Sequence, residues 1–123
     1  MDSADVEKIM KIEKELKAAH DLLSGRSKAY DAFVRLAKES FAGGALDPKT
    51  KELMAVAISL VIHCEPCLVR HVGEALRAGA RDEEIVESIG VAIEMGGGPA
   101  VVSSVFAVKV LEYFRDKHKG HSC

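Results

Sequence analysis

Apolar residues recur at intervals of three and four along most of this chain, which is the spacing of an α-helix with one buried face. The first such stretch, from Val6 to Leu23, predicts a helix over about residues 4–23 that ends before Gly25. A second stretch runs from Tyr30 to Phe41 and is followed by Gly43 and Gly44. Glycine suits this position because it readily adopts the backbone conformation that closes a helix.

Turn and cap residues divide the rest of the chain. Asp47 followed by Pro48 is a helix start, because the carboxylate accepts from free backbone N–H groups and proline has no N–H to lose. The final segment is rich in valine, but its length of ~18 residues and the proline at its start favour a helix over a strand. Four more helices are therefore predicted: from Pro48 to about Ile62, from Pro66 to Gly79, from a cap at Asp82 to Met95, and from Pro99 to about Lys117. The expected fold is an all-α bundle of about six helices.

Two of the predicted helices are apolar on nearly every side. They are the third, with apolar residues at almost every position from Leu53 to Ile62, and the sixth, from Val101 to Phe114. A small domain can enclose about one such helix, so two indicate burial against other subunits. The chain is therefore expected to form a homo-oligomer through these helices. The alternative is a single exposed apolar groove that binds a ligand.

Composition restricts the class of protein. The chain has 123 residues, of which 48% are hydrophobic, so it suits one domain with a real core. The formal net charge is −2, and no basic stripe with interleaved aromatic residues is visible, which argues against nucleic-acid binding. The acidic N-terminus lacks the features of a signal peptide, and the longest apolar run is far shorter than the ~20 residues that span a bilayer. We expect a cytoplasmic protein that binds no membrane.

The densest group of reactive side chains surrounds a pair of thiols. Cys64 and Cys67 are three residues apart, His71 follows one helical turn after Cys67, and Glu52 precedes Cys64 by twelve residues. Two cysteines at this helical spacing can form a disulfide. Thiolates are favoured at a helix start and beside a histidine, so His71 could accept a thiol proton and Glu52 could orient the imidazole. The pattern predicts thiols that are oxidised and reduced.

The distance between Glu52 and the thiols limits this hypothesis. A single straight helix would place Glu52 ~18 Å from Cys64. The groups can meet only if the chain folds back near residues 63–66, so that the fourth helix carries His71 toward Glu52, directly or through a water. A neighbouring subunit could supply the carboxylate instead.

Other assignments of the same residues stay open. The two thiols could be half of a zinc site, completed by His63, His71 or Glu52, although no second pair of cysteines exists to close it. Cys67 could simply pack as a small apolar residue, and Glu52 could be a solvated acid in the first turn of its helix. The C-terminal His118, His121 and Cys123 also resemble a metal-binding tail, but a frayed end with an incidental thiol is the preferred interpretation.

These motifs resemble the carboxymuconolactone decarboxylase and alkylhydroperoxidase D-like family. The resemblance extends from about Tyr30 to Phe106 and includes the segment 44–52, the Cys64, Cys67 and His71 signature, and the Gly-Gly-Gly-Pro-Ala segment at 96–100. It implies one domain over 1–123, with a family-like core at about 27–117 behind the N-terminal helix. It also implies trimers or hexamers of an all-helical subunit.

The resemblance implies one of two chemistries. Decarboxylase members act on a lactone acid without a cysteine pair, whereas alkylhydroperoxidase D-like members reduce peroxides with it and are re-reduced by an external dithiol. By similarity to the second group, Cys67 would attack the peroxide, Cys64 would form the disulfide, and Glu52 and His71 would relay protons. No cofactor or metal is implied.

One departure from the family pattern bears on the activity. Well-known peroxidase members have a histidine where this chain has Pro66, and His63 is a possible substitute in the relay. Weaker peroxidase activity or a disulfide reductase is therefore expected. The runner-up is a cofactor-free lyase that uses His71 and Glu52 as acid and base, and a non-enzymatic oligomer that binds ligands or stores metal is a third hypothesis.

Overall fold

A computed structural model describes residues 1–121, with side chains described through residue 117. Within that part the chain forms six helices and no strand, which confirms the predicted all-α fold. The helices are α1 (Ser3–Leu23), α2 (Lys28–Phe41), α3 (Pro48–Val61), α4 (Glu65–Arg77), α5 (Asp82–Gly96) and α6 (Gly98–His121).

The caps explain where the helices begin. The carboxylate of Asp47 accepts from the backbone N–H of Thr50 at 2.7 Å, with Pro48 in the first helical position, as the sequence predicts. The predicted cap of α5 is wrong by one residue. Arg81 occupies the cap position and Asp82 is already helical, because the backbone N–H of Arg81 donates to the Glu84 carboxylate at 3.0 Å and anchors the chain there.

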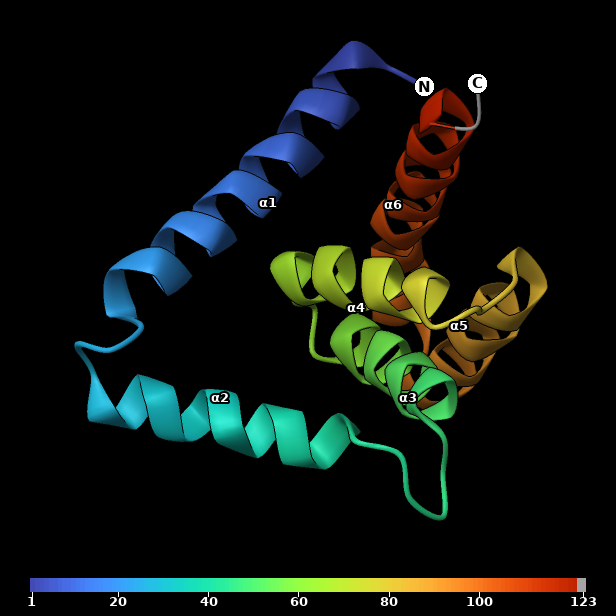
Figure 1. Ribbon diagram of the computed structural model, residues 1–123. Coiled ribbons are helices and arrows are strands. Elements are labelled where there is room, and N and C mark those ends of the chain that lie inside the picture. The colour runs from blue at the N-terminus through green and yellow to red at the C-terminus, as the bar shows by residue number, and fades with distance from the viewer. Residues whose placement is uncertain (122–123) are drawn as a thin grey trace.

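Helices α3 to α6 form the body of the molecule, and α1 and α2 lie to one side of it as two arms that meet at their connection (Figure 1). The core contains buried side chains from α1 and from each helix of the body, among them Ile9, Leu60, Leu68 and Ile85. Helix α2 contributes no buried residue. It is therefore the helix that hydrophobic burial holds least firmly.

Helices α4 and α6 approach closely at a glycine. A β-carbon added to Gly73 would lie 2.9 Å from the ring of Phe114, closer than real side chains come. The aromatic ring occupies the space that any larger residue at 73 would need. This contact sets the position of α6 against the helix that carries Cys67 and His71.

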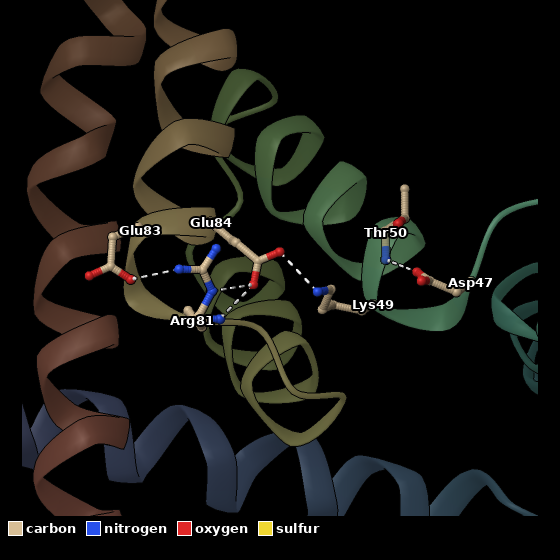
Figure 2. A network of polar contacts seen from close by, with 6 residues as sticks. All are labelled: Asp47, Lys49, Thr50, Arg81, Glu83 and Glu84. Atoms are coloured by element: carbon tan, nitrogen blue, oxygen red, sulfur yellow. Dashed lines mark hydrogen bonds and ion pairs between the residues drawn. The ribbon is translucent and has the colours of Figure 1, made fainter.

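A polar network joins the start of α3 to the start of α5 (Figure 2). Lys49 forms an ion pair with Glu84 at 2.9 Å. The hydrogen bond from the Arg81 backbone, together with Lys49, lowers the pKa of Glu84 below its ordinary value. The hydrogen bonds from Thr50 lower the pKa of Asp47 in the same way.

The apolar excess predicted for the third and sixth helices is present at the surface. The exposed side chains include Met54, Ile58 and Val61 on α3 and Val101, Val102, Val105 and Val108 on α6. Assembly into an oligomer through these faces stays a prediction. Among the described residues, no helix combines the length and apolar character that crossing a membrane requires.

Candidate active site

The cysteines lie where the chain turns from α3 into α4. His63 at this turn has φ of 57°, a left-handed conformation that non-glycine residues seldom adopt. The backbone N–H of Cys64 then donates to the Ser59 carbonyl at 3.0 Å. Cys64 caps α4, and its Sγ accepts from the backbone N–H of Cys67 at 3.2 Å. The fold thus places one sulfur where a helix start favours negative charge.

Cys64 and Cys67 are joined by a disulfide, with their α-carbons 5.2 Å apart. This separation lies within the range of about 4.4–6.8 Å that disulfides accept. Both residues are partly exposed. The pair predicted from the spacing is therefore able to form a bond that a solvent-borne thiol can reach.

Glu52 and His71 meet directly. His71 Nδ1 lies 2.8 Å from Glu52 Oε2, and the two side chains are only 18% and 12% exposed. The contact forms within one chain because α4 folds back along α3, as the distance argument required. An ionised carboxylate only accepts hydrogen bonds, so this contact places a proton on Nδ1. In neutral His71, Nε2 is then an acceptor.

The ring of Phe41 stacks against the imidazole of His71. The two rings are stacked, with centroids 5.3 Å apart and planes inclined by 23°. Phe41 is the last residue of α2, so this helix reaches the site at its end. Together, Glu52 and Phe41 limit the rotation of the imidazole.

Cys67 and His71 are four residues apart in one helix and share a face. Glu65, next to the thiols, forms an ion pair with Lys8 of α1 at 3.0 Å. Lys8 also lies 4.6 Å from the centre of the Phe106 ring. The lysine partly neutralises a carboxylate that would otherwise disfavour thiolates, a role that the sequence did not reveal.

His63, the possible relay residue, has a hydrogen-bond partner on α6. Its Nδ1 lies 2.6 Å from Ser103 Oγ of α6. Among the described residues, no hydrogen bond joins its side chain to either sulfur. The contact ties the turn before Cys64 to α6.

A cavity of about 690 Å³ lies between α1, α2 and α4. Glu52, His71 and Phe41 line it, whereas Cys64 and Cys67 are not among its lining residues. The sequence analysis missed the contributions of α1 and α2, which include a 2.6 Å contact between His20 Nδ1 and the Tyr30 hydroxyl. Helical periodicity gave no signal for them, because it does not say which distant helix faces which.

The zinc alternative finds no geometric support in the described part of the chain, where no three histidine, cysteine or acidic side chains gather as metal ligands. The C-terminal His118, His121 and Cys123, for which a frayed end is preferred over a metal-binding tail, lie outside the residues whose side chains are described.

Two bacterial proteins are similar in sequence over about the same region. One, described as uncharacterised protein 4 in the cox locus of Paracoccus denitrificans, is 48% identical over 82 residues, which cover 67% of this chain and 74% of that protein. An uncharacterised protein of Cupriavidus necator is 38% identical over 86 residues, or 70% of this chain and 74% of its own length.

Solved structures share the fold. A carboxymuconolactone decarboxylase family protein from Thermotoga maritima, suggested to take part in an antioxidative response, superposes with a TM-score of 0.83 at 30% identity, covering 92% of this chain and 97% of that one. A family protein from Legionella pneumophila gives a TM-score of 0.77 at 32% identity, covering 89% and 96%. The sequence pattern of the same family matches residues 27–110. The chain belongs to the carboxymuconolactone decarboxylase family.

Proposed function

We propose that the protein is a thiol-dependent peroxidase or disulfide reductase of the alkylhydroperoxidase D-like type. The observation that carries the proposal is the position of the Cys64–Cys67 disulfide, one helical turn before His71. The side chain of His71 is in turn hydrogen-bonded to the buried carboxylate of Glu52. A purely structural disulfide needs neither of those groups. The antioxidative role suggested for the Thermotoga maritima relative is consistent with this chemistry.

The proposed cycle begins with the reduced pair. His71 accepts the thiol proton of Cys67, and the thiolate attacks the terminal oxygen of a hydroperoxide. The O–O bond breaks, the leaving alkoxide takes the proton from His71, and Cys67 becomes a sulfenic acid. The Cys64 thiol then displaces water from that sulfenic acid and forms the disulfide. An external dithiol supplies two electrons and two protons to regenerate both thiols.

Glu52 supports the proton transfers without contacting the sulfur. By accepting from Nδ1–H it stabilises the charged imidazolium that forms when Nε2 takes a proton. Pro66 stands where better-known peroxidase members have another histidine, so a slower peroxide reaction than theirs is proposed. His63 is proposed as a further relay residue; its Nδ1 is hydrogen-bonded to the Ser103 hydroxyl.

A cofactor-free lyase is the second candidate. It is favoured by one observation: Glu52 and His71 line the cavity, whereas the sulfurs do not. In this alternative the two residues act as base and acid on a lactone acid, and the cysteines have no direct role. Activity toward carboxylated lactones that survives the loss of both thiols would support it.

We also propose that the protein is a cytoplasmic homo-oligomer, a trimer or hexamer. The exposed apolar faces of α3 and α6 support the assembly, because isolated subunits seldom expose so many adjacent aliphatic side chains. These faces contain neither Glu52 nor His71.

The test is intact-mass analysis with thiol mapping on fully reduced protein, before and after one equivalent of peroxide. Rapid loss of two hydrogens, mapped to Cys64 and Cys67 with Cys123 unchanged, is the expected result. Cys64→Ser and Cys67→Ser should each abolish turnover with an external dithiol, and Cys123→Ser is the matched control. Full turnover in either active-site variant would overturn the proposal.

A further inference from the structure

The cavity between α1, α2 and α4 has a mostly apolar lining. Leu16, Phe33, Val34, Phe41 and Phe114 contribute to its walls. Its volume of about 690 Å³ is typical of sites for small organic ligands. Hydrogen peroxide is hardly larger than a water molecule, which occupies about 30 Å³ in the liquid, and would use little of this space.

The acidic groups in the cavity wall are already paired. Glu13 accepts from the Tyr113 hydroxyl at 2.7 Å, Glu52 is bonded to His71 at 2.8 Å, and Glu74 forms an ion pair with Arg77. Lys117 also lies 3.9 Å from Glu13, so Glu13 and Glu74 each have a cationic partner. Glu52 keeps its charge, because the His71 ring that donates to it is neutral until it takes a second proton.

Two of the basic groups in the wall differ in this respect. Lys38 of α2 and Arg70 of α4 line the cavity, and neither forms an ion pair or a side-chain hydrogen bond with another described residue. Lys17, by contrast, is paired with Asp21 at 2.8 Å. With Lys38 and Arg70 unpaired and Glu52 the one carboxylate that lacks a cationic partner, the net uncompensated charge facing the cavity is positive.

The cavity wall and the redox pair share a helix face. Arg70, His71, Glu74 and Arg77 line the cavity from α4, and Cys67 precedes Arg70 by three residues and His71 by four. Residues at these spacings follow one another along the same side of a helix. A ligand that lies along these four side chains of α4 therefore has one end directed toward the turn that contains Cys67.

We infer that the cavity binds the organic part of a carboxylate-bearing hydroperoxide with an apolar body, and that Lys38 and Arg70 bind its carboxylate. The inference rests on the proposed function. The substrate R–O–OH reacts with the Cys67 thiolate and one proton to give the alcohol R–OH and the Cys67 sulfenic acid, which Cys64 converts to the disulfide with release of water. The carboxylate takes no part in the reaction and serves only in recognition.

The test compares cumene hydroperoxide, its para-carboxy derivative and hydrogen peroxide on fully reduced protein, with rapid quenching by a thiol-alkylating reagent and mass mapping of Cys64 and Cys67. The carboxylated compound should react fastest. Lys38→Met and Arg70→Met should each slow only that compound, by about three- to tenfold, because each removes one partly solvated charge interaction. Arg35→Met, on α2 but outside the cavity wall, is the matched control and should leave all three rates unchanged.

Two results would overturn the inference and leave the peroxidase proposal intact. One is that the neutral and carboxylated cumene hydroperoxides react at equal rates. The other is that Lys38→Met and Arg70→Met slow the reactions of all three oxidants equally. If no oxidant forms the Cys64–Cys67 disulfide, the proposed function fails. Calorimetric binding of 4-isopropylbenzoate to the oxidised protein then still tests the cavity. Binding that weakens in Lys38→Met and Arg70→Met but not in Arg35→Met supports the anion site, and absence of binding to the wild-type protein contradicts it.

Discussion

Glu52 and His71 are 19 residues apart in the chain, and their side chains are joined by a 2.8 Å hydrogen bond within one subunit. The bond exists because α4 returns along α3 after the turn at residues 62–64. Both partners are largely shielded from water, so the carboxylate interacts with the imidazole in a medium of lower polarity than the solvent. A charge at position 52 is therefore expected to matter for reactivity.

Glu52→Gln should slow oxidation of the reduced pair by peroxide by about 10²–10⁴-fold, the range that a positioned acid–base group contributes. The amide keeps the size of the side chain but loses the charge that stabilises the imidazolium. Stopped-time thiol mapping measures the rate. Glu39→Gln on the exposed face of α2 is the control, and an unchanged rate in Glu52→Gln would remove this residue from the mechanism.

Lys8→Met should lower the thiolate fraction of the reduced pair at neutral pH, because Glu65 then keeps an uncompensated negative charge beside the sulfurs. The rate of alkylation by iodoacetamide measures this fraction and should fall about two- to fivefold, as is typical of one exposed ion pair. Adding Glu65→Gln should restore the rate, which a merely structural effect of Lys8 would not explain. Lys11→Met, on the same helix, should have no effect.

Gly73→Ala should destabilise the protein by about 1–3 kcal/mol, the usual cost of forcing an extra methyl group into a packed core. The new β-carbon would meet the Phe114 ring at 2.9 Å. Gly90→Ala is an informative contrast, because no atom lies within 4 Å of a β-carbon there, and it should stabilise α5 by about 0.5–1 kcal/mol. Urea unfolding measures both, and equal effects would contradict the packing argument.

Stability should fall in acid partly through Asp47 and Glu84. Their pKa values are lower in the folded protein than in the unfolded chain, because Thr50 donates to Asp47, and because Arg81 and Lys49 favour ionised Glu84. The stabilisation is therefore complete above the ordinary carboxyl pKa and is lost as the pH falls through the lowered values. Urea midpoints between pH 7 and pH 2 test this.

Lys49→Met should reduce the urea midpoint at pH 7 and converge with the wild-type protein at low pH, where Glu84 is protonated. Both groups are partly exposed to solvent, so added salt should also diminish the difference. A gap between the two proteins that persists unchanged at pH 2 would mean that Lys49 acts through packing.

The sequence was sufficient for the parts of this protein that depend on local spacing. Periodicity and cap residues predicted six helices, and the requirement that Glu52 approach the thiols predicted the reversal of the chain before α4. The same reasoning could not find Lys8 beside Glu65 or Ser103 beside His63, because each pair joins helices far apart in the chain. The cap of α5 was misplaced because a backbone bond to Glu84, rather than a side chain at the cap, anchors that helix.

Helix α2 supplies Lys38 and part of the apolar wall of the cavity but no buried side chain, whereas α3 and α4 supply Glu52 and His71 from well-packed positions. Substitutions on α2 consequently carry a small thermodynamic cost, and substitutions beside the reactive groups carry a large one. Preference for one substrate over another can therefore drift through changes in α2 while the chemistry stays intact. Helix α2 is therefore the place where substitutions can change substrate specificity at the smallest cost in stability, both in evolution and in protein engineering.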